Sequence, residues 1–136
     1  MTYSVVIVED EVEVAQLLAQ YLLLPNGVAG NNTPKQSLRQ GQYQVVGIAG
    51  NLATAKALLQ AVNPDLVLLD IHLPDGNGLD LLSDLRRLNI KSEVMLLTAA
   101  KEVEILEKAM QLGASDFLVK PLMLSRLDQA LARFEA

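Results

Sequence analysis

The chain has 136 residues, of which 51% are hydrophobic and 20% are charged, and its formal net charge is -5. This composition excludes an intrinsically disordered chain, and the absence of cysteine excludes a disulfide scaffold, thiolate metal sites and cysteine catalysis. The negative charge argues against direct binding of nucleic acid, and no apolar run approaches the ~20 residues that cross a bilayer, so we expect one cytoplasmic domain over residues 1–136, with no membrane partner.

Short apolar runs alternate with segments of helical periodicity along the chain. The runs lie at 4–8, 45–49, 65–69, 93–97 and 116–119. Because these runs are continuous rather than alternating, each predicts a strand that is buried on both faces. Apolar residues at helical spacing follow the runs, at 14–22, 55–62, 81–88, 103–110 and 124–134. The alternation predicts an α/β fold of three layers, with a five-stranded parallel sheet between two layers of helices.

Local signals mark the ends of some helices and one irregular segment. Asn63 and Pro64 are typical of a helix end, and Ser125 with Asp128 resembles a capping box at a helix start, with Asp in place of Glu. Residues 25–43 are rich in Asn, Gly, Gln and Pro, show no periodicity, and exceed the usual length of a connection. We interpret them as a surface loop inserted between the first helix and the second strand.

Polar side chains follow four of the predicted strands. They are Glu9, Asp10 and Glu11 after the first strand, Asp70 after the third, Thr98 after the fourth and Lys120 after the fifth. Because the carboxyl ends of parallel strands meet at one edge of an open sheet, we expect these side chains to lie together. Each of them alone is more often an ordinary solvated residue. Their convergence is what predicts a site.

The charges of this group predict a metal ion. Glu9, Asp10 and Asp70 would repel one another strongly unless cations neutralise them. Lys120 and a divalent cation would bring the sum of charges to zero, and carboxylate ligands favour Mg²⁺. Asp70, held at a strand end, would be a nucleophile toward phosphorus. The Thr98 hydroxyl and the Lys120 ammonium would bind the phosphoryl oxygens.

Four motifs occur in order at these strand ends. They are VEDE at 8–11, DIHLPDGNG at 70–78, LTAA at 97–100 and GASDFLVKP at 113–121. Over essentially its whole length the chain resembles the CheY-like receiver domain of two-component response regulators. Within that family it is most similar to the CitB-like citrate and C4-dicarboxylate regulators. The resemblance implies a flavodoxin-like sheet with strand order 2-1-3-4-5.

The resemblance also implies a role for each acidic residue. Asp70 would accept a phosphoryl group from a sensor histidine kinase. Glu9, Asp10, Asp70 and the backbone carbonyl of His72 would surround Mg²⁺. The domain would catalyse its own phosphorylation and slow dephosphorylation, and it would not be an enzyme acting on a separate substrate.

A conformational switch follows from the same resemblance. Thr98 would move toward the phosphoryl group and Phe117 would turn inward behind it. The Lys120–Pro121 bond would be cis. The surface of the fourth helix, fifth strand and fifth helix would change and could pair two copies of the domain.

Particular residues disfavour the alternative functions. A haloacid-dehalogenase-like phosphohydrolase needs a second Asp where His72 stands, and a mononucleotide binder would find its phosphate repelled by Glu9–Glu11. A pseudo-receiver without phosphorylation would not need Asp70 and Lys120. The chain stops at Ala136, after the last predicted helix. We therefore expect either a free-standing receiver or the first part of a transcription regulator with a C-terminal DNA-binding domain.

Overall fold

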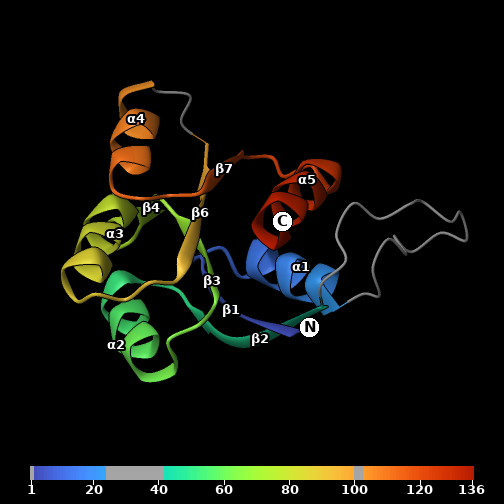
Figure 1. Ribbon diagram of the computed structural model, residues 1–136, viewed down its shortest axis with the longest axis horizontal. Coiled ribbons are helices and arrows are strands. Elements are labelled where there is room, and N and C mark those ends of the chain that lie inside the picture. The colour runs from blue at the N-terminus through green and yellow to red at the C-terminus, as the bar shows by residue number, and fades with distance from the viewer. Residues whose placement is uncertain (1, 24–41, 100–102) are drawn as a thin grey trace, which may run out of the picture.

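The computed structural model describes residues 2–23, 42–99 and 103–136. Within them, five parallel strands form one sheet in the order β2-β1-β3-β6-β7 (Figure 1). These strands are β1 (Thr2–Val8), β2 (Gln42–Ala49), β3 (Leu66–Asp70), β6 (Glu93–Thr98) and β7 (Asp116–Val119). Since β6 and β7 are the fourth and fifth strands of this sheet along the chain, the predicted order 2-1-3-4-5 is confirmed.

Helices cover both faces of the sheet. The described helices are α1 (Val12–Leu23), α2 (Leu52–Val62), α3 (Gly78–Arg87), α4 (Val103–Gln111) and α5 (Leu124–Glu135). Figure 1 shows α1 and α5 on one side of the sheet and α2, α3 and α4 on the other. The predicted three-layer α/β fold is therefore confirmed. None of the described helices is long and apolar enough to cross a membrane.

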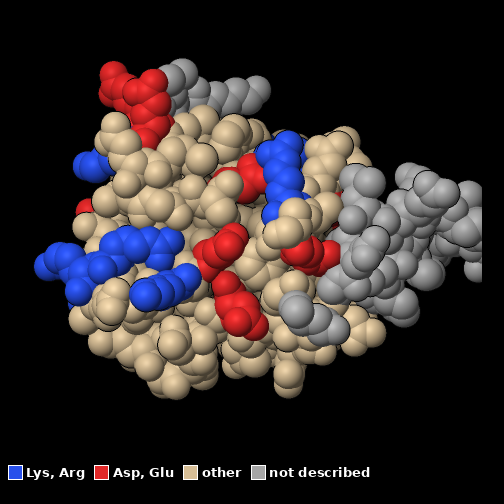
Figure 2. Space-filling view, viewed as in Figure 1, with Lys and Arg blue, Asp and Glu red and all other residues tan. Residues whose placement is uncertain are grey.

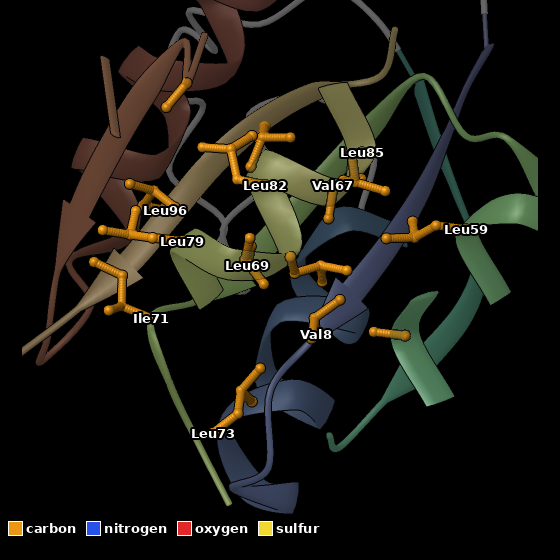
Figure 3. Packing of buried hydrophobic residues seen from close by; sticks show 14 of the residues in the cluster. Val8, Leu59, Val67, Leu69, Ile71, Leu73, Leu79, Leu82, Leu85 and Leu96 are labelled. Carbon is orange, nitrogen blue, oxygen red and sulfur yellow. The ribbon is translucent and has the colours of Figure 1, made fainter. Parts of the chain in front are cut away.

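The alternation of side chains along each strand builds two cores. In β1, Val5 and Ile7 pack with α1 and α5, whereas Val6 and Val8 pack with α2 and α3. Figure 3 shows the second of these cores, in which Val8 lies among leucines of the sheet, α2 and α3. Burial of each large apolar side chain contributes about 1.5–3 kcal/mol. Because both faces of the central strands are covered, their ends are held rigidly.

Strand β2 begins earlier than the sequence indicates. Gln42 and Tyr43 belong to the strand, and the Tyr43 side chain is buried. The Tyr43 ring stacks on Tyr3 with 5.6 Å between centroids, and its hydroxyl donates to Glu135. The predicted loop boundary at Tyr43 is therefore wrong, because long-range packing makes this tyrosine part of the core. The rest of the predicted loop, 25–41, lies outside the described residues.

The helix-end signals have different outcomes. The predicted helix end at Asn63 and Pro64 is confirmed, because Asn63 is the C-terminal cap of α2 and adopts the left-handed conformation, with φ 45°. The predicted capping box of α5 is wrong, because the helix begins after Met123, which provides no side-chain cap. Asp128 lies inside α5 and accepts a hydrogen bond from the Tyr21 hydroxyl at 2.7 Å. A tertiary contact to α1 therefore takes the place of the expected local one.

A small antiparallel hairpin follows β3. It consists of β4 (His72–Leu73) and β5 (Gly76–Asn77), and the register pairs His72 with Asn77. The turn of the hairpin contains Asp75. Gly76 in this turn has φ +148°, which residues with a Cβ rarely adopt. The hairpin was not predicted from the sequence, because its two strands are too short to show a period.

Candidate functional site

The predicted site residues lie at the carboxyl edge of the sheet. Glu9 follows β1, Asp70 ends β3, Thr98 ends β6 and Lys120 follows β7. Strands β1, β3, β6 and β7 are consecutive neighbours in the sheet, so parallel pairing brings these residues to one edge. Glu9 and Asp70 are buried. The face drawn in Figure 2 shows exposed charge instead, with a few acidic side chains near its middle and a group of Lys and Arg side chains to one side.

Lys120 is the cation at the centre of the group. Its Nζ lies 2.6 Å from Glu9 Oε1, 3.0 Å from Asp70 Oδ2 and 3.1 Å from Glu11 Oε1. The Lys120 side chain is 16% exposed, whereas the side chains of Glu9 and Asp70 are almost fully buried. Three carboxylates therefore share one ammonium group, and two of them, Glu9 and Asp70, are removed from water, whereas the Glu11 side chain is exposed.

Asp10 adds a further carboxylate to this group. One oxygen each from Glu9, Asp10 and Asp70 lies within 4.8 Å of the others. Glu9 and Asp70 are buried, and Asp10 is exposed to solvent. Oxygen donors at this spacing, two of them removed from water, have the chemistry that a hard divalent cation requires. The residues therefore fit the metal site predicted from the sequence.

Electrostatics at the site favour an additional cation. Burial raises the pKa of Glu9 to about 7; the hydrogen bond to Lys120 opposes this shift and the neighbouring Asp70 adds to it. For Lys120, burial by itself would lower the pKa, but the hydrogen bonds to Glu9, Asp70 and Glu11 outweigh it and raise the pKa. The ammonium thus stays charged at neutral pH. Glu9 is only partly ionised there, and a second cation would favour its ionised form.

The backbone around Asp70 is tightly held. Asp70 Oδ1 accepts a hydrogen bond from the His72 N–H at 3.0 Å, which closes a turn after the strand. The Ile71 N–H donates to Leu97 O at 3.1 Å and so extends the contact with the β6 strand. A Cβ on Gly78 would lie 2.5 Å from the Asp70 carbonyl oxygen, so a larger residue there would displace the loop. Asp70 is therefore presented in one fixed position.

Thr98, Phe117 and the peptide bond after Lys120 lie at the neighbouring strand ends. Thr98 is fully buried, and its carbonyl accepts a hydrogen bond from the Lys120 N–H at 2.8 Å. The register pairs Thr98 with Val119, so Phe117, two residues earlier, is on the same face of the sheet. Phe117 is partly buried against the core under α2, α3 and α4. The Lys120–Pro121 peptide bond is cis.

The side chains of Asp116 and Arg126 form hydrogen bonds with the backbone of Phe117 at the open edge of the sheet. The Phe117 N–H donates to Asp116 Oδ1 at 2.8 Å, and its carbonyl accepts from Arg126 Nη2 at 3.0 Å. Arg126 also pairs with Asp116 at 2.7 Å. Because β7 is an edge strand, these contacts occupy backbone groups that would otherwise be free to pair with another strand. The position of Phe117 therefore depends on α5.

An apolar hollow lies next to Lys120. It has a volume of about 580 Å³ and is lined by Glu11, Val14, Leu17, Ala99, Lys120, Pro121 and Leu122. Leu17 on α1 is 47% exposed, and Val12 on the same helix is 65% exposed. Exposed apolar side chains thus border the acidic site on the α1 side.

Two residues of this region were not singled out as site residues from the sequence. Glu11 was noted only as one of three acids after the first strand, yet it pairs with Lys120. Asp75 lies in the hairpin turn and accepts hydrogen bonds from the Leu52 and Ala53 N–H groups. No local signal identifies either contact, since each joins residues far apart in the sequence.

Comparison with known proteins identifies the chain's family. The sequence profile of the response regulator receiver domain matches residues 29–132. The chain belongs to this family. The receiver is 34% identical over 131 residues to the transcriptional regulatory protein DpiA of Escherichia coli K12, covering 96% of the receiver and 51% of DpiA. It is 39% identical over 93 residues to the transcriptional regulatory protein CitB of Klebsiella pneumoniae, covering 68% of the receiver and 40% of CitB.

Solved structures agree with this assignment. The signal receiver domain of NarL from Mycobacterium tuberculosis superposes with a TM-score of 0.75 and 26% identity, covering 97% of this receiver and 94% of that chain. The receiver spans about half the length of the curated relatives it matches. The expected membership of the response regulator receivers, with CitB among its relatives, is confirmed. The chain is a receiver domain of two-component phosphorelay signalling.

Proposed function

We propose that this receiver is phosphorylated on Asp70 in a Mg²⁺-dependent reaction, with the phosphohistidine of a sensor histidine kinase as donor. The observation that carries the proposal is the position of Asp70. Its carboxylate is buried, fixed by the His72 N–H, and 3.0 Å from the Lys120 ammonium, within a cluster of acids. A nucleophilic carboxylate beside a fixed cation is the arrangement that phosphoryl transfer needs.

Glu9, Asp10, Asp70 and the backbone carbonyl of His72 are the groups that would hold Mg²⁺. The close spacing of the three carboxylates and the raised pKa of Glu9 support this assignment. When bound, the ion neutralises the acids and offsets the charge of the incoming phosphoryl oxygens.

The remaining residues of the site act on the phosphoryl group. An Asp70 carboxylate oxygen forms the new bond to phosphorus while the bond from phosphorus to the donor imidazole breaks, and the imidazole leaves with its electron pair and is protonated by solvent. Lys120 binds a phosphoryl oxygen through its ammonium group, and the Thr98 hydroxyl donates to another. We propose that the domain also catalyses its own slow dephosphorylation. In that step water attacks the phosphorus, the bond from phosphorus to the Asp70 oxygen breaks, inorganic phosphate is released and the Asp70 carboxylate is regenerated.

We infer that the signal is transmitted through the surface of α4, β7 and α5. Movement of Thr98 toward the phosphoryl group would vacate space behind it, and Phe117 on the same face of the sheet is placed to fill that space. The contacts of Phe117 with Arg126 connect this movement to α5. This surface is also where we propose that two copies pair after phosphorylation.

The partners and the output follow from the surroundings of the site. A kinase that delivers phosphorus to Asp70 must contact the rim beside it, and the apolar hollow next to Lys120 provides a contact surface. We propose that residues 1–136 form a single receiver domain that works in the cytoplasm. DpiA and CitB, the relatives named above, are transcriptional regulators, so we propose that this receiver controls transcription through a DNA-binding domain.

The experiment that tests this function uses a small phosphodonor. Incubation with acetyl phosphate and Mg²⁺ is expected to add one phosphoryl group to the wild type, as measured by intact-protein mass spectrometry. Asp70→Asn is expected to remain unlabelled, and removal of Mg²⁺ by a chelator is expected to abolish labelling of the wild type. Asp80→Asn, which removes an exposed carboxylate from the first turn of α3, is the matched control and is expected to label normally.

Labelling of Asp70→Asn equal to that of the wild type would show that another residue is the acceptor. Absence of labelling in the wild type, with Mg²⁺ and at high donor concentration, would support the pseudo-receiver alternative instead. Undiminished labelling in the presence of the chelator would remove the metal from the mechanism.

A further inference from the structure

The first turn of α2 is capped by two side chains from different parts of the chain. N–H groups at the start of a helix have no partner within the helix. Asn51 Oδ1 accepts from the Thr54 N–H at 2.8 Å. Asp75 Oδ1 accepts from the Leu52 N–H at 2.7 Å, and its Oδ2 accepts from the Ala53 N–H at 3.1 Å. Both oxygens of Asp75 are thus used in a long-range cap.

Asp75 is also closely connected to the phosphoryl acceptor. It lies in the turn of the β4–β5 hairpin, five residues beyond Asp70. At the base of the hairpin the His72 N–H donates to Asp70 Oδ1 at 3.0 Å, and the Gly78 N–H donates to Ile71 O at 2.6 Å. The turn and the acceptor therefore belong to one hydrogen-bonded unit.

The start of α2 is in turn joined to the acids that follow β1. The Glu9 N–H donates to Ala49 O at 2.9 Å, so the segment leading into α2 is bonded directly to Glu9. A Cβ on Gly50 would lie 3.8 Å from Asp10 Cα, in ordinary van der Waals contact. The pairing of β1 with β3 and the ion pairs of Lys120 already join Glu9 to Asp70. Asp75 adds a second connection, because it bonds the start of α2, which contacts the acids after β1, to the loop that follows Asp70.

We propose that Asp75 is a positioning residue, which by capping α2 holds the loop of Asp70 and His72 at a set separation from Glu9 and Asp10. The inference rests on the proposed function, because the same four residues are those assigned to Mg²⁺. If Asp75 instead only stabilises α2, its loss lowers the stability of the domain and leaves metal binding unchanged.

The test compares two caps of the same helix. Mg²⁺ alone is titrated calorimetrically into the wild type, Asp75→Ala, Asp75→Asn and Asn51→Ala. Asp75→Ala is expected to weaken Mg²⁺ binding by about tenfold, as is typical when a group that supports metal ligands is removed. Asp75→Asn, which keeps one acceptor oxygen, is expected to have an intermediate affinity. Asn51→Ala is expected to lower thermal stability, as cap losses do, but to bind Mg²⁺ like the wild type.

Asp80→Asn is a control for the loss of one negative charge, and it is expected to bind Mg²⁺ normally. Wild-type Mg²⁺ affinity in Asp75→Ala would overturn the positioning role, and so would an equal loss in Asn51→Ala. If Asp75→Ala does not fold, Asp75→Asn decides, and wild-type affinity in that variant overturns the inference. Because Mg²⁺ binding is measured without any phosphodonor, this result is separate from whether Asp70 is phosphorylated.

Discussion

Strand β7 has an ion cluster at each end. One cluster has more cations than anions, and the other has more anions than cations. At its start, the buried carboxylate of Asp116 pairs with Arg126 at 2.7 Å and with Arg133 at 3.4 Å. Beyond its end, the ammonium of Lys120 is surrounded by three carboxylates. Cations are in excess at the first cluster and anions at the second.

The difference separates a structural ion pair from a binding site. Arg126 and the Phe117 N–H satisfy the Asp116 carboxylate, which needs no further cation, and the additional arginine, Arg133, is largely exposed to water. The Lys120 cluster retains net negative charge even though Glu9 and Asp70 are almost fully buried. A protein tolerates such an excess when a ligand compensates it. The comparison therefore predicts that replacing an aspartate by asparagine lowers the free energy of unfolding at the Asp116 cluster and raises it at the Lys120 cluster.

The largest expected effect is on stability. Asp116→Asn is expected to destabilise the domain by about 3 kcal/mol, because it leaves a partly buried arginine without its counter-charge. Asp70→Asn is expected to stabilise the metal-free domain, because it reduces the repulsion around Glu9. Urea unfolding of both variants without metal measures the two free energies.

Arg133→Gln is the control for Asp116. The Arg133 side chain is 70% exposed, so its pair contributes less than about 1 kcal/mol. If Asp70→Asn is destabilised as much as Asp116→Asn, the acidic cluster is not strained and the comparison fails.

The second largest expected effect is a dependence of the free energy of unfolding on pH, and its source is Glu9. Its pKa in the folded protein is about 7, above the ordinary value of 4.5, so the folded state binds more protons than the unfolded state between these limits. The contribution of Glu9 to stability is therefore present below pH 4.5 and is lost as the pH rises through 7, by about 2–3 kcal/mol between pH 5 and pH 8. Glu9→Gln is expected to lack this decrease in urea unfolding of the metal-free domain at pH 5 and pH 8.

Mg²⁺ is expected to oppose the same decrease, since it favours the ionised form of Glu9. Its stabilising effect should be larger at pH 8 than at pH 6. A wild type whose stability relative to Glu9→Gln does not change between pH 5 and pH 8 would contradict the raised pKa.

The smallest expected effect concerns Lys120. Lys120→Gln removes the cation that competes with Mg²⁺ for the buried carboxylates, so Mg²⁺ affinity is expected to rise by about tenfold, or 1.4 kcal/mol. Phosphorylation by acetyl phosphate is expected to slow at the same time, because the ammonium no longer binds the phosphoryl group. Calorimetry and mass spectrometry measure the two changes, and weaker Mg²⁺ binding in this variant would contradict the competition.

The sequence anticipates the acidic cluster for a simple physical reason. Glu9, Asp70, Thr98 and Lys120 each follow a continuous apolar run, and such runs are recognisable without knowledge of the fold. Parallel pairing then brings the four strand ends to one edge, so the chain positions alone predict which residues meet. The core residues of β1 and β3 are predictable for the same reason, since strands covered on both faces must be apolar throughout.

Other contacts depend on packing that no local pattern encodes. Asp75 caps a helix that begins 23 residues earlier, and Tyr43 is buried against Tyr3 at the opposite end of the sheet from the acids. Asp128 is bonded to Tyr21 of α1 instead of capping its own helix. These pairings arise only when helices and strands have been placed against one another.

Periodicity and strand-end chemistry, read from the sequence by itself, determined the α/β fold and the residues that gather at the carboxyl edge of the sheet, and the resemblance of four motifs indicated the family. Only the tertiary structure decided how those residues share charge. It places Lys120 between three carboxylates, puts Asp116 between two arginines, and attaches the loop after Asp70 to α2 through Asp75. Burial and distance set the energy of an ion pair or a cap, and both become defined only when distant segments pack together.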